Sequence, residues 1–327
     1  MGMGQAGTEQ GMGMRGISAQ ENSLRHRLEQ AFEAGLPLAP KTEAHLAAAL
    51  ASTLRRPGNM VRAVLAFRVA QAFGLSEDRS EKIGVAIEYF HTASLLFDDL
   101  PCMDDAKHRR GAPCAHERFG EGTAILAALG LVNRAYGLLW AAVVALEANR
   151  QSRALSYVER QLGVAGLLNG QSQDIHYSAL RHESAHPQEI ALGKTVSLIR
   201  LSLVMPAILG GATGRETQLL ERVSLMWGLA YQTLDDLKDV LHTSETAGKT
   251  AARDAHLDRP NLALAIGVEA AFARVERLMD LSDRAIARLA AGRSEVSFLA
   301  ALRGKFEKEI ASLRHAQAAE ARLALAS

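Results

Sequence analysis

The chain has 327 residues, 48% of them apolar, and its 37 Lys and Arg against 36 Asp and Glu give a formal charge of +1. A near-neutral chain has no overall field for holding nucleic acid, so we expect no nucleic-acid partner and only local sites for polyanions. Its two cysteines, Cys102 and Cys114, are too few for a disulfide framework. Together with an N-terminus that lacks a signal peptide, this favours a reduced, cytoplasmic protein.

The order of elements along the chain predicts an all-α fold. Residues 1–17 are Gly-rich and without periodicity, so we expect a disordered segment followed by one domain over residues 18–327. In that domain apolar residues recur at helical spacing, and Pro and Gly stand between the apolar segments. We expect about ten helices, among them residues 82–97, 122–148, 154–169, 188–209, 216–241 and 262–291.

The most apolar stretch covers residues 124–146. It carries Asn133 and Arg134 at its middle, so we expect a buried helix and no membrane span. Its many alanines suit close helix packing, including packing at a subunit interface. Trp140 and Trp227 are expected in the core.

A first acidic cluster follows an apolar run. The pair Asp98 and Asp99 ends the run SLLF, and Asp104 comes shortly after. Pro101 disfavours the α conformation at the residue before it, so the helix should end just after the first pair. The chain can then curl and bring Asp104 back towards Asp98.

A second acidic cluster lies far downstream. Asp235 and Asp239 are four residues apart and share one helix face, with Asp236 between them. Carboxylates gathered against apolar residues repel one another, and hard oxygen ligands beside a cleft suit Mg²⁺. The alternative for either cluster alone is a solvated helix end.

Basic residues accompany both clusters. Arg109 and Arg110 lie just past the first one, Lys194 and Thr195 open another apolar helix, and Lys249 follows the second cluster. Each alone could be an ordinary surface residue. In combination, acids and cations of this kind describe a metal-bridged diphosphate site.

Four motifs together resemble the trans-isoprenyl diphosphate synthases, the head-to-tail prenyltransferases. They are HTASLLFDDLPCMDDAKHRRGAPCAH with its DDxxxxD spacing, GQSQD, GKT and YQTLDDLKD. The resemblance covers roughly residues 50–270 and is greatest to the bacterial geranylgeranyl diphosphate synthases. It implies a single helical bundle around a central catalytic cavity, a homodimer, and Mg²⁺ bound as three ions when substrate is present.

The resemblance also implies residue roles. The metal ligands would be Asp98, Asp104 and Asp235, with Asp99 and Asp239 assisting. Asp236, Lys194 and Lys249 would complete the catalytic residues. The allylic diphosphate would be held by Arg109, Lys194, Thr195, Gln232 and Lys249. Isopentenyl diphosphate would be held by Arg62, His91 and Arg110.

The implied reaction is a Mg²⁺-dependent condensation of isopentenyl diphosphate with dimethylallyl, geranyl or farnesyl diphosphate. Small residues at Ala93 and Ser94, about one turn before Asp98, favour geranylgeranyl diphosphate as the product. The alternatives are a farnesyl diphosphate synthase, a terpene cyclase of the same fold, and a non-catalytic partner subunit.

One position departs from the family pattern. Asn59 stands where the family usually has a lysine that binds isopentenyl diphosphate. Our hypothesis is that Arg55 or Arg56 supplies the missing positive charge.

Overall fold

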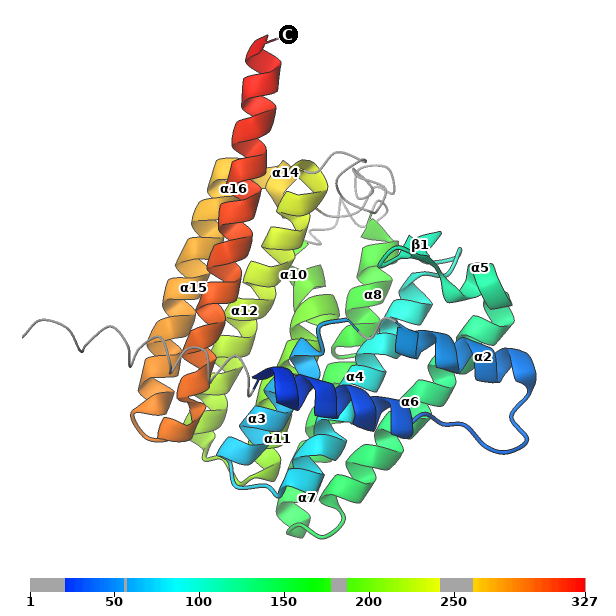
Figure 1. Ribbon diagram of the computed structural model, residues 1–327. Coiled ribbons are helices and arrows are strands. Elements are labelled where there is room, and N and C mark those ends of the chain that lie inside the picture. The colour runs from blue at the N-terminus through cyan, green and yellow to red at the C-terminus, as the bar shows by residue number, and fades with distance from the viewer. Residues whose placement is uncertain (1–20, 56–57, 178–186, 242–260, 327) are drawn as a thin grey trace, which may run out of the picture.

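The computed structural model describes residues 21–55, 58–177, 187–241 and 261–326 (Figure 1). Most of them are helical and almost none are in strands, which confirms the predicted all-α fold. In these ranges the one sheet is a two-stranded antiparallel ribbon of β1 (His108–Arg109) and β2 (Ala112–Pro113). The segment 1–17, expected to be disordered, lies outside the described residues.

The elements follow one another along the chain with short connections. The first half contains a helix over residues 21–34, then α2 (Ala44–Ser52), η1 (Thr53–Arg55), α3 (Val61–Ala72), α4 (Glu77–Asp98), α5 (Ala115–Phe119), α6 (Glu121–Val143), α7 (Ala148–Leu162) and α8 (Leu167–Ile175). The second half contains α10 (Pro187–Ala191), η2 (Leu192–Val196), α11 (Ser197–Leu209), α12 (Gly214–Leu241), α14 (Leu262–Ile266), α15 (Val268–Ala290), η3 (Ser294–Leu302) and α16 (Arg303–Ala326). Of the short elements, η2 is a π-helix and η1 and η3 are 3₁₀-helices.

Two of the expected helices are divided in two, and a third is shortened. The expected helix over 154–169 breaks near Gly163, and the one over 262–291 breaks at Gly267, whose φ of 87° is accessible to glycine at little cost. The helix expected over 122–148 stops at Val143, and the Gln151 side chain then caps the exposed carbonyls of Val144 and Leu146.

The core forms around α4 and α11. α4 packs between α3 and α6, and α11 contacts α3, α7 and α12 and is buried along nearly its whole length. The helix over 21–34 crosses α4, where the Tyr89 hydroxyl donates to the carbonyl of Phe32 at 2.6 Å (Figure 1). Trp227 is buried, as expected. The core prediction for Trp140 is wrong, because this side chain is 56% exposed on α6.

Two helical stretches are long and apolar enough to cross a membrane by length and composition. In Pro187–Leu209, 78% of the apolar window is buried inside the protein, as in a core helix. In Glu121–Val143 the buried share is 39%, so this helix has an apolar face on the outside as well.

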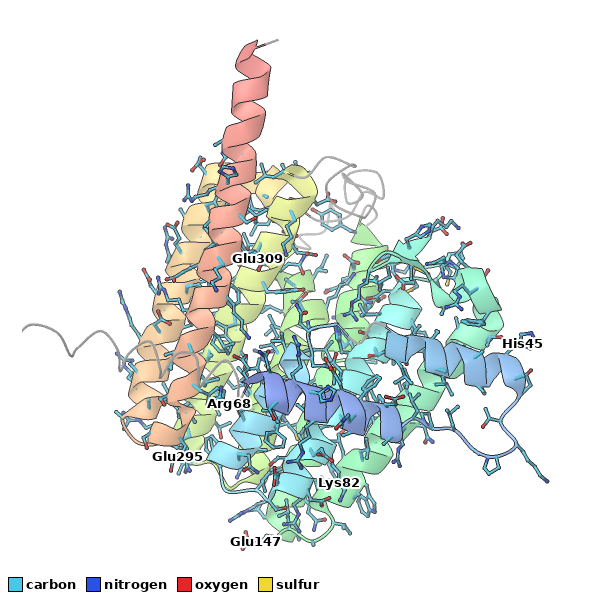
Figure 2. All side chains as sticks on the ribbon, viewed as in Figure 1. His45, Arg68, Lys82, Glu147, Glu295 and Glu309 are labelled. Carbon is cyan, nitrogen blue, oxygen red and sulfur yellow. The ribbon has the colours of Figure 1, made fainter. Side chains whose placement is uncertain are left out.

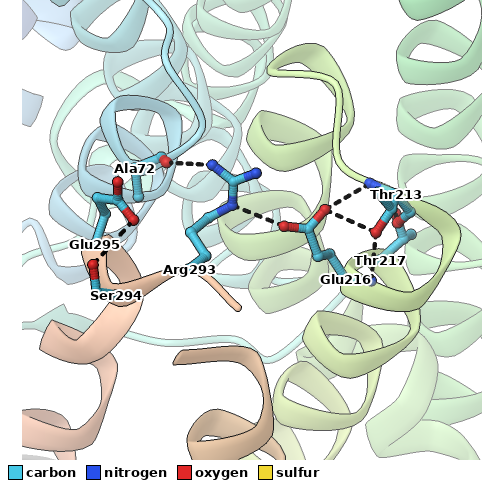
Figure 3. A network of polar contacts seen from close by, with 7 residues as sticks. All are labelled: Ala72, Thr213, Glu216, Thr217, Arg293, Ser294 and Glu295. Atoms are coloured by element: carbon cyan, nitrogen blue, oxygen red, sulfur yellow. Dashed lines mark hydrogen bonds and ion pairs between the residues drawn. The ribbon is translucent and has the colours of Figure 1, made fainter. Parts of the chain in front are cut away.

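One arginine joins three segments at the end of the bundle (Figure 3). Arg293 donates to Glu216 at 2.8 Å and to the carbonyl of Ala72 at 3.1 Å. Glu216 also accepts a hydrogen bond from the backbone N–H of Thr213, whose hydroxyl receives one from the backbone N–H of Glu216. This reciprocal pair is a capping box for α12, so Arg293 fixes the start of α12 against the end of α3.

The last helix, α16, lies along α12 and extends beyond it (Figure 1). Glu309 of α16, labelled in Figure 2, forms an ion pair with Lys238 of α12. This contact attaches the last helix to the segment that carries the second acidic cluster.

Candidate active site

The first acidic cluster forms a tight loop at the end of α4. The helix ends at Asp98, and the backbone N–H of Asp104 returns to donate to the carbonyl of Asp98 at 2.9 Å. The curl predicted from Pro101 is therefore confirmed. Burial raises the pKa of Asp98 to about 6; Lys194 opposes that shift, and the charge of Asp104 adds to it.

Asp99 faces a different partner. It is 3% exposed, and its carboxylate accepts hydrogen bonds from Nε of Arg109 at 2.7 and 2.9 Å, with Nη2 also at 2.6 Å. This bidentate pair fixes the guanidinium group of Arg109 beside the acidic loop. The charge of Arg109 also acts on Asp98 and favours its ionised form.

Lys194 lies in the π-helix η2, a distortion that often marks functional positions. Its ammonium donates to Asp174 at 2.7 Å. Burial opposes the charge, but Asp174 and Asp98 outweigh burial and raise the pKa of Lys194, so the side chain stays charged. One cation thus lies among the carboxylates of α4 and α8.

Two glycines allow this arrangement. A Cβ atom on Gly170 would overlap the backbone nitrogen of Lys194, and one on Gly193 would lie 2.7 Å from the Cα of Gly170. The helices α8 and η2 therefore cross in backbone contact, which only glycine permits. The crossing also lets Gln171 donate a hydrogen bond to Asp98.

Thr195 connects η2 to α12. Its hydroxyl donates to Gln232 at 2.7 Å, and the Gln232 amide donates to Asp236 at 2.9 Å. The second oxygen of Asp236 accepts from the backbone N–H of Leu262 at 2.8 Å, and burial raises the pKa of this carboxyl to about 6. Asp236 thus anchors α14 to α12, and its catalytic role stays a prediction.

Asp235 and Asp239 lie on the same helix as Asp236, close enough for their charges to raise its pKa further. The side chain of Asp235 is 47% exposed, with the Lys238 ammonium 3.9 Å away. The helix periodicity therefore separates the anchoring acid Asp236 from the half-exposed Asp235.

The residues expected to hold isopentenyl diphosphate also gather. Arg62 at the start of α3 lies 3.3 Å from Nε2 of His91 on α4. Arg110 packs against Gly58, where a Cβ would come within 2.5 Å of its guanidinium. Asn59, in the same loop, is exposed.

The two expected chain-length residues are described, whereas three expected basic residues are not, or only in part. Ala93 is buried at 1% exposure, and the neighbouring Ser94 hydroxyl donates to the carbonyl of His91. Lys249 and Arg56 lie outside the described residues, as does the side chain of Arg55. The hypothesis that one of these arginines replaces the missing lysine stays a prediction.

Sequence reasoning assigned no role to three side chains of the site. Gln171 and Asp174 belong to the motif GQSQD, whose spacing places them on one face of α8. Glu88 lies one turn before His91 on α4 and is buried at 3% exposure. Glu88 could have been found from the sequence as a charged residue on an otherwise apolar helix face.

The acidic loop fits Mg²⁺ better than a metal held by protein alone. Within the described ranges, no group of three or more His, Cys, Asp and Glu side chains is placed to hold a metal ion. Mg²⁺ commonly binds through one or two carboxylates, with water and substrate phosphates completing its shell. Asp98 and Asp104, two oxygen donors on one loop, are suited to that mode.

Comparison with known proteins agrees with the motifs. Residues 43–289 match the model of the polyprenyl synthetase family. Over 224 residues the chain is 34% identical to the chloroplastic geranylgeranyl pyrophosphate synthase of Capsicum annuum, a match covering 68% of this chain and 61% of that protein. Over 265 residues it is 33% identical to the heterodimeric geranylgeranyl pyrophosphate synthase large subunit 2 of Arabidopsis thaliana. That match covers 80% of this chain and 68% of that protein.

A solved structure supports the same grouping. The geranyltransferase of Helicobacter pylori, complexed with magnesium and isoprenyl diphosphate, is similar with a TM-score of 0.75 and 26% identity. The alignment covers 89% of this chain and 97% of that chain.

The pKa values of Asp98 and Asp236, both raised to about 6, predict how stability depends on pH. Burial favours the neutral carboxyls in the folded state, so their contribution to stability is fully present below the ordinary Asp pKa of 3.8 and is lost as the pH rises through about 6. We expect this contribution to the Tm of metal-free protein to fall between about pH 4 and pH 6. Since Mg²⁺ requires ionised ligands, it should raise Tm only above about pH 6.

Thermal unfolding in EDTA and in Mg²⁺ tests this expectation. Asp98→Asn should show a smaller pH dependence than the wild type, whereas Asp78→Asn, an exposed position on the same helix, should not differ from it. A metal-free Tm that rises across this window would contradict the assignment.

Proposed function

The chain belongs to the polyprenyl synthetase family, and from this membership we propose that it is a Mg²⁺-dependent prenyltransferase that makes geranylgeranyl diphosphate. It would join isopentenyl diphosphate head to tail to dimethylallyl, geranyl and farnesyl diphosphates. The carrying observation is the pair Lys194 and Thr195. Lys194 forms an ion pair with Asp174 of α8 and its charge acts on Asp98 of α4, and the Thr195 hydroxyl donates a hydrogen bond to Gln232 of α12. Relatives named geranylgeranyl pyrophosphate synthase support the product.

The difficult step is breaking the allylic C–O bond, because negative charge develops on the departing diphosphate. Mg²⁺, as three ions held through Asp98, Asp104, Asp235 and Asp239, would offset that charge. Lys194, kept protonated by Asp174, supplies a fixed positive charge at the same place. Arg109, oriented by Asp99, supplies another, and Lys249 is assigned to the same diphosphate.

The second substrate completes the reaction. Arg62, His91 and Arg110 would bind the diphosphate of isopentenyl diphosphate and orient its double bond towards the allylic carbon. A new C–C bond forms from that double bond, and the C–O electron pair leaves with the diphosphate. A proton is then lost from isopentenyl C2 to restore a double bond, with the released diphosphate as its acceptor.

The test is an assay of the purified protein with Mg²⁺, labelled isopentenyl diphosphate and each allylic primer, with products separated by chain length. We expect a twenty-carbon diphosphate, and Asp98→Asn should abolish it. A fifteen-carbon end product would indicate a farnesyl diphosphate synthase. A cyclic hydrocarbon formed without isopentenyl diphosphate would indicate a terpene cyclase, and no turnover a non-catalytic partner subunit.

The side chain at position 93 is expected to limit chain length. Ala93 is fully buried in the turn before Asp98, so Ala93→Tyr should obstruct the growing chain and shift the main product to fifteen carbons. Ala93→Ser, nearly the same size, serves as the matched control. Because an added ring can overpack a core by about 1–3 kcal/mol, Tm is measured alongside. An unchanged product length in folded Ala93→Tyr would refute this role.

We also propose that the protein acts as a homodimer through the outer face of α6. Leu126, Leu129, Tyr136 and Trp140 are each 45–57% exposed there, although the opposite face of α6 is buried against the core. Tyr136 and Trp140 also line a surface pocket with Leu155 of α7. A contiguous apolar surface of this kind is typical of a protein interface.

Charge placed on this face should separate the subunits. We expect Leu129→Glu and Trp140→Glu to convert a dimer into monomers in light scattering coupled to size exclusion. Leu281→Glu, an exposed leucine on α15, should leave the mass unchanged. A monomeric wild type would contradict the proposed assembly.

A cytoplasmic location stays a prediction. It is supported by the two cysteines, neither of which forms a disulfide, whereas named relatives include chloroplastic proteins.

A further inference from the structure

A lysine stands between the second acidic cluster and the last helix. The Lys238 ammonium of α12 forms an ion pair with Glu309 of α16 and lies 3.9 Å from Oδ1 of Asp235, one turn earlier on α12 (Figure 2). It is therefore in direct contact with one carboxylate and beyond hydrogen-bond distance from the other. Both partners of the ion pair are only partly exposed, whereas nearly half of the Asp235 side chain is exposed.

An aromatic ring also borders this ammonium. Nζ of Lys238 lies 5.9 Å from the centroid of the Tyr231 ring, and the guanidinium carbon of Arg62 lies at the same distance from it. The electron-rich face of an aromatic ring attracts a cation, so the ring helps to keep the ammonium where it is. Lys238 is thus held at a junction of α12 and α16 and is not a freely solvated surface charge.

Lys238 stays charged in this position. Burial opposes its charge, but the hydrogen bond to Glu309 and the charges of Glu309 and Asp235 outweigh burial and raise the pKa of the ammonium. A lysine stem is flexible, so a small rotation would bring the ammonium from 3.9 Å into contact with Asp235. In that position it would compete with a divalent cation for the carboxylate, because like charges repel.

Glu309 is fixed on its own helix by packing. Phe306, Ile310 and Leu313 recur at helical spacing on α16; the last two are buried, and the ring of Phe306 lies 6.5 Å from that of Trp227 on α12. Glu309 lies three residues after Phe306, on the side of α16 that meets α12. Its carboxylate is therefore presented to Lys238 by a docked helix.

We propose that Glu309 is a positioning residue for the metal site: by binding the Lys238 ammonium, it keeps the Asp235 carboxylate available to Mg²⁺. The inference rests on the proposed function, in which Asp235 is a metal ligand. Glu309 acts through Lys238 and touches neither substrate nor reacting atoms. The last helix thereby takes part in the reaction, although it lies beyond both acidic clusters in the sequence.

The decisive variant is Glu309→Gln, which keeps the shape of the side chain and removes its charge. The released ammonium should pair with Asp235, so we expect the Mg²⁺ concentration for half-maximal thermal stabilisation, at constant inorganic pyrophosphate, to rise about threefold. Glu307→Gln removes a 2.8 Å contact to Arg303 on the same helix and is the matched control, with an unchanged Mg²⁺ requirement.

A second pair of variants separates this role from a direct effect of the Glu309 charge on the metal. Lys238→Met removes the competing ammonium, so it should require no more Mg²⁺ than the wild type. Adding Glu309→Gln to Lys238→Met should then change the Mg²⁺ requirement by less than about 1.5-fold. If the added substitution weakens Mg²⁺ binding as much as it does in the wild type, Glu309 acts directly and the positioning role is refuted.

The enzyme assay gives a second readout of the same variants. In Glu309→Gln the Mg²⁺ concentration for half-maximal elongation should rise about threefold, while kcat at saturating Mg²⁺ changes less than about twofold. If Glu309→Gln does not fold, Glu309→Asp and Glu309→Asn give the same comparison of charged with neutral, and the Asp variant should require less Mg²⁺.

Failure of the proposed function is distinguishable from failure of this inference. A wild type that elongates a primer, with an unchanged Mg²⁺ requirement in folded Glu309→Gln, would overturn the inference alone. A wild type that elongates no primer but shows the expected shift in thermal stabilisation would overturn the proposed reaction and uphold the positioning role. A wild type that Mg²⁺ and inorganic pyrophosphate do not stabilise would overturn both.

Discussion

The ion pair between Lys194 and Asp174 is the interaction on which the site depends. It joins two helices that cross in backbone contact at Gly170 and Gly193, so ammonium and carboxylate meet at 2.7 Å with little freedom to separate. A buried charge deprived of its partner costs about 3–5 kcal/mol. The crossing therefore sets the position of a charged lysine, whose charge acts on Asp98 and Asp104 of the acidic loop after α4.

Two cations of the site are each paired with a different carboxylate. Arg109 is clamped by Asp99, and Lys194 is paired with Asp174. Neighbouring cations would otherwise repel one another in the free protein, so these acids permit a high local density of positive charge. The proposed metal ligands Asp98 and Asp235 are other acids than these two.

The sequence predicted the loop that returns Asp104 to Asp98 and the helices that carry the acids, because both follow from local rules. Pro101 ends α4, and its loop returns Asp104 to Asp98 as expected. The exposure of Trp140 could not be predicted in this way, since α6 is apolar on both faces and periodicity does not say which face meets the core. Asp174 was missed because its partner Lys194 lies on another helix and only the packing of helices brings the two together.

The apolar helix α6 connects two of the proposed features. Its alanine face packs along α4, the helix that carries both Ala93 and Asp98, and its leucines and Trp140 face outward. Close-packed interiors transmit small displacements because they contain few voids to absorb them. The proposed partner would therefore press on the helix that packs along α4, where the proposed chain-length residue Ala93 lies. In the proposed function, chain-length control and assembly would then depend on opposite faces of the same helix.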